Sequence, residues 1–151
     1  MAEQQAFAPQ RIYLKDLSFE APHAPGIFLD DWEPDINVEM DNTVTSIDEA
    51  GVYDVQLKVT LTAKLGDKTA YVAEVVQGGI FLVTGFEEED RARLTGSVCP
   101  EMLYPYARSA ISGLLSQASF PPFLLTPVNF DYIYSKRLQE VDKANAAADS
   151  D

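Results

Sequence analysis

Residues 53–65 read YDVQLKVTLTAKL. Apolar side chains occupy every second position from Tyr53 to Leu65, and polar or charged side chains occupy the positions between them. An alternation of period two is typical of a β-strand with one buried and one solvated face. We therefore predict a strand over residues 53–65 whose apolar face forms the centre of the core.

A neighbouring strand is predicted over residues 69–82, and the loop before it decides which face of that strand meets the core. A two-residue loop at Gly66-Asp67 would pair Val59 with Glu74 and bury a carboxylate, which is costly. A three-residue loop over residues 66–68 keeps Glu74 on the solvated face, and we predict this register. Three aliphatic side chains then surround Glu74 on the exposed face: Val72, Val76 and Ile80. Either a docking surface or partial cover by a loop explains such exposure.

Shorter periodic runs predict the other elements. Alternation over residues 11–20 and 36–40 indicates two further strands. A run of acids favours a helix that ends at Gly96, a second helix follows from Pro100, and a last one begins at about Asn129. The helix after Pro100 carries a seam of mostly small residues, which suits either core or a self-association face: Leu103, Ala107, Ala110, Ile111, Leu114 and Ala118.

Two connections are rich in apolar residues although they cannot be regular structure. Proline and glycine interrupt residues 21–34, and three prolines interrupt residues 120–127. Because an apolar connection must lie over apolar surface, the large aromatic residues in both segments suit ordinary core. They equally suit a groove that takes extended peptide segments. These aromatic residues are Phe28, Trp32, Phe120 and Phe123.

The order of elements predicts an α+β fold in which a four-stranded antiparallel sheet is followed by two helices packed on one face. The length of 151 residues suits one domain with a real core. We expect that domain over residues 11–141, between a flexible N-terminal segment over residues 1–10 and a flexible acidic C-terminal tail over residues 142–151.

The charge of the chain is strongly unbalanced. Twenty-four acidic residues against 11 basic ones give a net charge of −13, and residues 1–50 hold 11 of the acids and 2 of the bases. A surface of this sign repels phosphate backbones and anionic lipid headgroups, which argues against nucleic-acid and direct membrane binding. No signal peptide or transmembrane stretch is visible, and the single Cys99 excludes an internal disulfide, so we expect a cytoplasmic protein.

No set of residues is suited to catalysis or cofactor binding. Cys99 lies far along the chain from the only histidine, His23, so the two are interpreted as a buried hydrophobe and a loop residue. Gly78-Gly79 lacks the Lys and helix start of a phosphate-binding loop and predicts a β-bulge. The acidic residues 30–35 lack the glycine and distal glutamate of a calcium loop. We therefore expect no catalytic residue, no metal and no cofactor.

Six stretches, in order along residues 11–140, resemble SecB, a family of bacterial export chaperones. Each stretch alone has little specificity, but together and in the family's order they are highly specific. They are Arg11-Ile12-Tyr13-Leu14-Lys15-Asp16-Leu17-Ser18-Phe19-Glu20-Ala21-Pro22, Asp31-Trp32-Glu33-Pro34, Gln77-Gly78-Gly79-Ile80-Phe81, Cys99-Pro100, Tyr104-Pro105-Tyr106-Ala107-Arg108 and Pro127-Val128-Asn129-Phe130-Asp131.

The resemblance implies a homotetramer, built as a dimer of dimers, that acts as an ATP-independent chaperone. Such a chaperone binds unfolded secretory precursor proteins in the cytosol and delivers them to the translocation motor SecA. The family's client-peptide groove maps onto Phe28, Trp32, Ile36, Val38, Met40, Tyr134 and Leu138. Its SecA-binding face maps onto Asp16, Glu20, Val72 and Glu74.

Two other classes of protein compete with this interpretation. The first is a small acidic α+β enzyme that uses a carboxylate pair, because 24 acids offer many pairs although no spacing singles one out. The second is an adaptor that binds a partner through the exposed sheet face and holds no unfolded chain.

Overall fold

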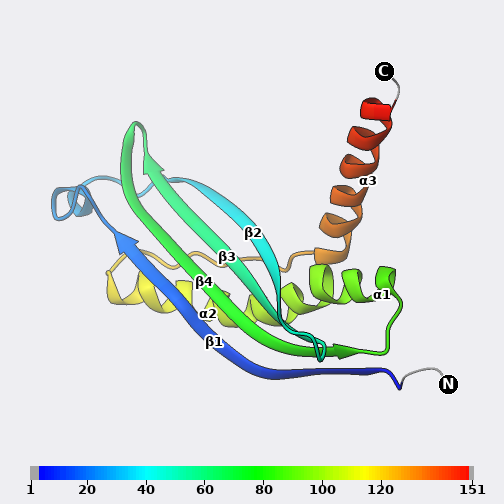
Figure 1. The fold of residues 1–151 in the computed structure, drawn as a ribbon. Coiled ribbons are helices and arrows are strands. Elements are labelled where there is room, and N and C mark those ends of the chain that lie inside the picture. The colour runs from blue at the N-terminus through cyan, green and yellow to red at the C-terminus, as the bar shows by residue number, and fades with distance from the viewer. Residues whose placement is uncertain (1–3, 150–151) are drawn as a thin grey trace.

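A computed structural model describes residues 4–149 as one sheet with helices that follow it in the chain (Figure 1). The strands are β1 (Ala6–Glu20), β2 (Asp35–Asp48), β3 (Val52–Leu65) and β4 (Lys68–Thr84). The helices are the short 3-10 turn η1 (Gly26–Leu29), α1 (Glu88–Arg93), the π-helical turn η2 (Leu94–Val98), α2 (Cys99–Gln117) and α3 (Phe130–Asp149). The predicted α+β class with a four-stranded antiparallel sheet is confirmed.

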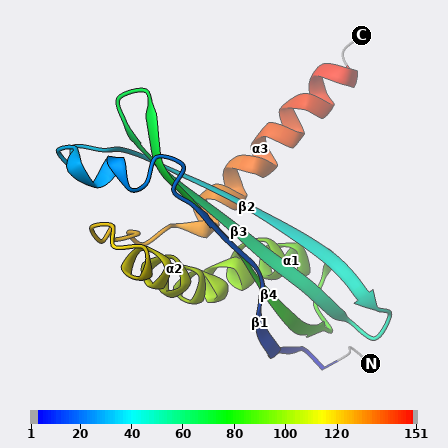
Figure 2. The ribbon, with the colours of Figure 1, turned by 90° about the vertical axis from the view of Figure 1, so that its left-hand side faces the viewer.

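The sheet has the strand order β1-β4-β3-β2, so the two strands with the longest apolar runs lie at its centre. Helix α2 packs across β3 and β4 on one face and buries Leu103, Ala107 and Ile111 of the predicted seam against the sheet. Helix α3 instead projects away from the sheet (Figures 1 and 2). The expectation of two helices packed on one face is therefore wrong for α3, whose contacts are mainly with η2.

The predicted register between β3 and β4 is confirmed, but the loop that sets it is not the predicted one. Val59 pairs with Val75, and Glu74 lies opposite Thr60 on the face away from α2. The loop has two residues, because Leu65 pairs directly with Lys68. The pairing then skips Ala70, and this bulge supplies the one-residue shift that we had assigned to a longer loop.

Two similar bulges explain the irregular alternation of β1. Its pairing with β4 shifts between Pro9 and Arg11 and again between Leu14 and Asp16. Without the second shift, Leu14 and Leu17 would point to opposite faces, because they are an odd number of residues apart. The bulge keeps both on the side of the sheet that α2 covers.

The glycine pair of β4 is not a bulge, which corrects the sequence interpretation. The β3–β4 pairing runs through Gly78 and Gly79 without a shift. A side chain at Gly78 would lie 2.2 Å from the ring of Tyr13, and one at Gly79 would lie 2.5 Å from Phe81. Gly78 therefore lets the Tyr13 ring cross the strand, and the Tyr13 hydroxyl donates a hydrogen bond of 2.5 Å to Asp54 Oδ1 on β3.

The helical region is continuous, so Gly96 does not end a helix as predicted. Gly96 lies inside η2, which joins α1 to α2. A Cβ at Gly96 would lie 2.9 Å from the ring of Tyr134, so the glycine makes room for the first turns of α3. Pro105 is accommodated inside α2 at an exposed position.

The boundaries of the domain also differ from those predicted. Strand β1 begins at Ala6, so residues 6–10 belong to the sheet and not to a separate N-terminal segment. Helix α3 continues to Asp149, past the predicted boundary at residue 142. The flexibility expected of the two ends stays a prediction, and its outermost positions lie outside the described residues.

The close approach of Tyr13 to Gly78 predicts a large loss of stability for Gly78→Ala. The new methyl group would displace the ring and its hydrogen bond to Asp54, and such overpacking costs about 1–3 kcal/mol. Gly113→Ala in α2 is the matched control, because, apart from its chain neighbours and the backbone of its own helix, no described atom lies within 4 Å of its Cβ position. That control should gain about 0.5–1 kcal/mol in a urea unfolding curve. Equal stability of Gly78→Ala and the parent chain would contradict the packing described.

Candidate functional site

A cluster of aromatic rings lies where the crossover of residues 21–34 meets the sheet. The Phe120 ring is at its centre, 5.0 Å from Phe28, 5.7 Å from Trp32 and 5.0 Å from Tyr71, measured between ring centroids. Phe19 of β1 closes the cluster at 5.7 Å from Tyr71. Phe28 is 47% exposed, whereas Phe120 and Tyr71 are buried. The rings of the crossover thus cover the inner rings of the cluster.

Tyr71 has an unusual environment within this cluster. Its side chain is fully buried, and its hydroxyl has no hydrogen-bond partner among the described residues. Burial raises the pKa of Tyr71 to about 12, so the hydroxyl keeps its proton at any physiological pH. A buried hydroxyl without a partner costs about 1–3 kcal/mol.

An apolar pocket of about 420 Å³ lies between β2, the irregular segment after α2 and the start of α3. The prolines of residues 120–127 keep that segment extended, so it lies over β2 and does not continue α2. The Tyr104 hydroxyl ties the segment to α2 by donating a hydrogen bond of 2.5 Å to the Thr126 carbonyl. The lining residues carry no charge: Val38, Met40, Tyr104, Phe123, Leu124, Leu125, Thr126, Val128 and Ile133.

The structure divides the seven predicted groove residues among three places. Val38 and Met40 line the apolar pocket, and Ile36 packs at the edge of the core on the same strand. Phe28 and Trp32 belong to the aromatic cluster. The two predicted residues of α3 lie apart from both: Tyr134 packs on Gly96, with the Arg93 guanidinium 5.2 Å from its ring centroid, and Leu138 is 43% exposed.

Several residues outside the seven predicted positions also lie in these two apolar places. Ile133 of α3, the neighbour of Tyr134, lines the pocket. Phe120 and Tyr71 form the inner part of the aromatic cluster. The sequence signal for Phe120 was its place among prolines, whereas Tyr71 looked like any inward residue of a strand.

Helix α3 is fixed against the rest of the chain by polar contacts near the pocket. Arg93 pairs with Asp131 in its first turn, and the Ser97 hydroxyl lies 3.5 Å from the same carboxylate. Two turns further along, Arg137 donates a hydrogen bond of 2.6 Å to Asn42 Oδ1 and lies 3.7 Å from the Asp41 carboxylate on β2. These contacts hold the helix that carries Ile133 against β2, on one side of the pocket.

All four residues predicted for the second site share the other face of the sheet. Glu20 pairs with Val72 across the β1–β4 ladder, and Asp16 pairs with Val76 two positions from Glu74. Glu74 accepts a hydrogen bond of 2.9 Å from Thr60, and the Lys58 ammonium lies 3.5 Å from it. No helix of the described residues covers this face (Figure 2). We call the residues Asp16, Glu20, Val72 and Glu74 the outer acidic face.

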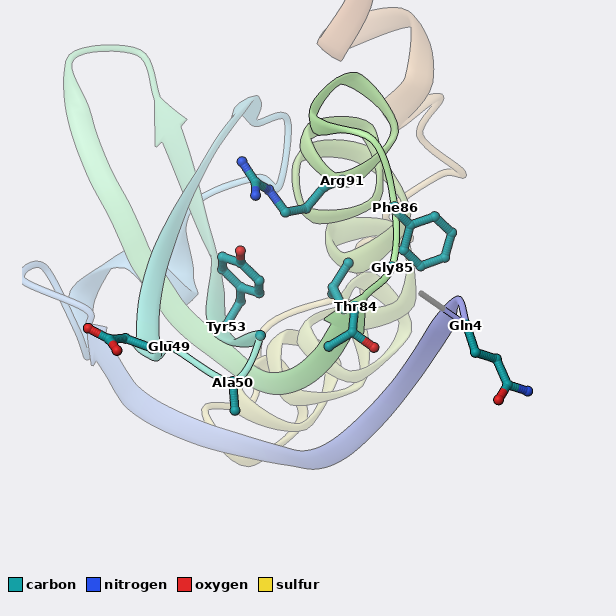
Figure 3. Close-up of a pocket in the computed structure, with 10 residues that line it drawn as sticks. Gln4, Glu49, Ala50, Tyr53, Thr84, Gly85, Phe86 and Arg91 are labelled. Carbon is teal, nitrogen blue, oxygen red and sulfur yellow. The ribbon is translucent and has the colours of Figure 1, made fainter. Parts of the chain in front are cut away.

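A second, more polar cavity of about 540 Å³ lies at the opposite end of the sheet (Figure 3). It is bounded by the β2–β3 turn, the end of β4 and Arg91 of α1, whose side chain lies above Tyr53. Arg91 is also 3.9 Å from Glu88 in its own helix. None of the predicted site residues lines this cavity.

The described residues assemble no recognisable catalytic centre. Cys99 is buried in α2, and burial raises the pKa of its thiol to about 12, so it is not an active nucleophile. His23 is exposed in the crossover. Within residues 4–149, no group of three potential metal ligands is found, and no helix is long and apolar enough to cross a membrane.

Comparison with known proteins gives a consistent result. The chain matches the family described as preprotein translocase subunit SecB over residues 1–141. A protein-export protein SecB from Alcanivorax borkumensis is 45% identical over 148 residues, which cover 97% of this chain and 94% of the relative. One from Nitrosococcus oceani is 46% identical over 147 residues, covering 96% and 89%.

A solved structure shares the fold at low sequence identity. It is a SecB-like chaperone from Mycobacterium tuberculosis in complex with a ChAD peptide from the HigA1 antitoxin. The TM-score is 0.64 at 18% identity, covering 81% of this chain and 87% of that one.

The family match and the relatives identify the chain as a chaperone of protein export, and the fold and the uncharged pocket are consistent with this class. The chain belongs to the SecB family, which confirms the resemblance noted in the sequence. The same findings give no support to an enzyme with a carboxylate pair.

Proposed function

We propose that the chain holds non-native secretory precursor proteins in the cytoplasm, without nucleotide, by their apolar segments. The uncharged pocket at Val38, Met40 and Ile133 carries this proposal, together with the aromatic cluster. Such sites accept many apolar side chains with little discrimination. A folded protein buries its apolar segments, so the sites favour chains that fold slowly. Support also comes from the peptide bound to the mycobacterial chaperone of the same fold.

The pocket predicts that Val38→Ser weakens client binding. The substitution removes methyl groups from the lining, and each buried methylene contributes about 0.8 kcal/mol, so we expect affinity to fall roughly fivefold to tenfold. The measurement is the refolding rate of a denatured secretory precursor with and without stoichiometric chaperone, in the absence of nucleotide.

Val44→Ser is the matched control for Val38→Ser. It makes the same chemical change on the same strand, but Val44 is 41% exposed and lies outside the pocket. We expect the control to slow refolding as the parent chain does. If the parent chain does not slow refolding at all, the proposed function is wrong.

We further propose that the outer acidic face binds the SecA motor. It combines the carboxylates of Asp16, Glu20 and Glu74 with the partly exposed Val72 on a face that no described helix covers, and this combination suits a partner with basic and apolar groups. The pocket opens on the other side of the sheet, where Val38 and Met40 point. Client and motor therefore have separate surfaces in this proposal.

Charge reversal on the outer acidic face should weaken SecA binding and leave client binding within about twofold of the parent value. We expect Asp16→Lys and Glu74→Lys each to lower SecA affinity about fivefold to tenfold, because each removes one attraction and adds one repulsion. Glu89→Lys in α1 is the matched control, because it makes the same change outside the face. Titration with SecA and with an unfolded precursor measures both affinities, and equal losses of the two would show that the surfaces are not separate.

The homotetramer implied by the family, a dimer of dimers, is also part of this proposal. Ala110 and Ala118 of the α2 seam are half-buried and small, and the half-buried Leu114 between them is apolar, so this stripe suits close packing against another copy. We expect a native mass of about four times 16.7 kDa by mass spectrometry. A monomer at micromolar concentration would contradict this assembly.

A further inference from the structure

The Tyr71 hydroxyl differs from the other buried polar side chains in the described part of the chain. Gln77 donates a hydrogen bond of 2.9 Å to the Tyr13 carbonyl, and Thr95 donates one of 3.1 Å to the Arg91 carbonyl. Tyr104, the other buried tyrosine, donates to the Thr126 carbonyl. The Tyr71 hydroxyl has no such partner within residues 4–149. A phenylalanine would supply the same ring contacts without an unsatisfied group.

The crossover of residues 21–34, which lies over Tyr71, contacts the sheet mainly through side chains. Trp32 stacks on Tyr71 at 6.2 Å, and Phe28 packs on Phe120. The backbone hydrogen bonds of the crossover join residues 21–33 to one another and not to the sheet. Its ion pair to the sheet, Asp30 with Lys68, spans 4.0 Å between exposed groups. Rotation of the Phe28 and Trp32 side chains therefore breaks ring contacts without breaking those backbone hydrogen bonds.

We infer that the Tyr71 hydroxyl donates a hydrogen bond to a backbone carbonyl of a client segment whose aromatic side chain replaces Trp32 in the cluster. The inference rests on the proposed chaperone function and makes it more specific. The rings of Tyr71 and Phe120, which lie next to Trp32, select an aromatic side chain. A carbonyl is present at every residue of a polypeptide, so this hydrogen bond places no requirement on the client sequence beyond the aromatic residue.

Tyr71→Phe tests the inference because it should change stability and binding in opposite directions. The free protein loses an unsatisfied buried hydroxyl, so its thermal midpoint should rise by about 2–6 °C. A short unstructured peptide with one central Phe should bind about threefold to tenfold more weakly, because one hydrogen bond to the client is lost. The same peptide with Ala in place of Phe should bind the two proteins equally.

Trp32 provides a direct signal for the site, because it is the only tryptophan of the chain. Its fluorescence emission should shift to longer wavelength when the Phe peptide binds, as the indole leaves the cluster for water. Tyr106→Phe is the matched control for the hydroxyl, since Tyr106 is 53% exposed, and it should change neither quantity. Tyr104→Phe should lower the thermal midpoint, because its hydroxyl is bonded.

The inference would be overturned if Tyr71→Phe bound the Phe peptide with parent affinity. A lowered thermal midpoint would overturn it as well, since the hydroxyl would then have a partner in the free protein. In either case a parent chain that still slows precursor refolding leaves the proposed function intact. A parent chain that binds neither peptide nor precursor would remove both.

Discussion

The pairing of β3 with β4 is the constraint on which the rest of the structure depends. With Val59 opposite Val75, the apolar face of β3 continues into an apolar face of β4, and α2 can cover both. The same pairing turns Glu74 outward beside Thr60, where its charge stays partly solvated. If β4 turned its other face toward α2, the Glu74 carboxylate would be buried under that helix, which is costly without a partner for the charge. The fold and the outer acidic face are therefore consequences of a single register.

Much of the sheet could be predicted because the alternation of apolar and polar side chains in a strand involves consecutive residues. The alternation over residues 53–65 predicted β3 to within one residue, and the burial cost of Glu74 predicted the register. The bulge at Ala70 could not be predicted, because an alanine fits a loop or a strand equally well. The continuity of α1, η2 and α2 was missed for a related reason. A glycine usually ends a helix, but Gly96 instead makes room for the ring of Tyr134, which follows far later in the chain.

The structure brings some of the predicted site residues together and leaves others apart. Val38 and Met40, which alternate on one strand, line one pocket. On α3 the residue that lines this pocket is Ile133, whereas Tyr134 packs on Gly96, because the angle at which a helix leaves the body is set by contacts that the local pattern does not contain. The aromatic cluster combines β1, the crossover, β4 and the segment after α2, so only the tertiary structure brings its rings together. Whether these residues bind clients or SecA stays a prediction.

The bulge at Ala70 has a consequence for how this hairpin can change over time. Beyond Ala70, neighbouring residues such as Tyr71 and Val72 point to opposite sides of the sheet, one into the aromatic cluster and one onto the outer acidic face. If Ala70 were retained and paired with Ala63, the two sides would be exchanged along the rest of β4. Deleting Ala70 alone removes the bulge but leaves Tyr71 opposite Ala63, so every later residue keeps its side of the sheet. A lineage can therefore lose this residue without any compensating change in the turn at Gly66-Asp67.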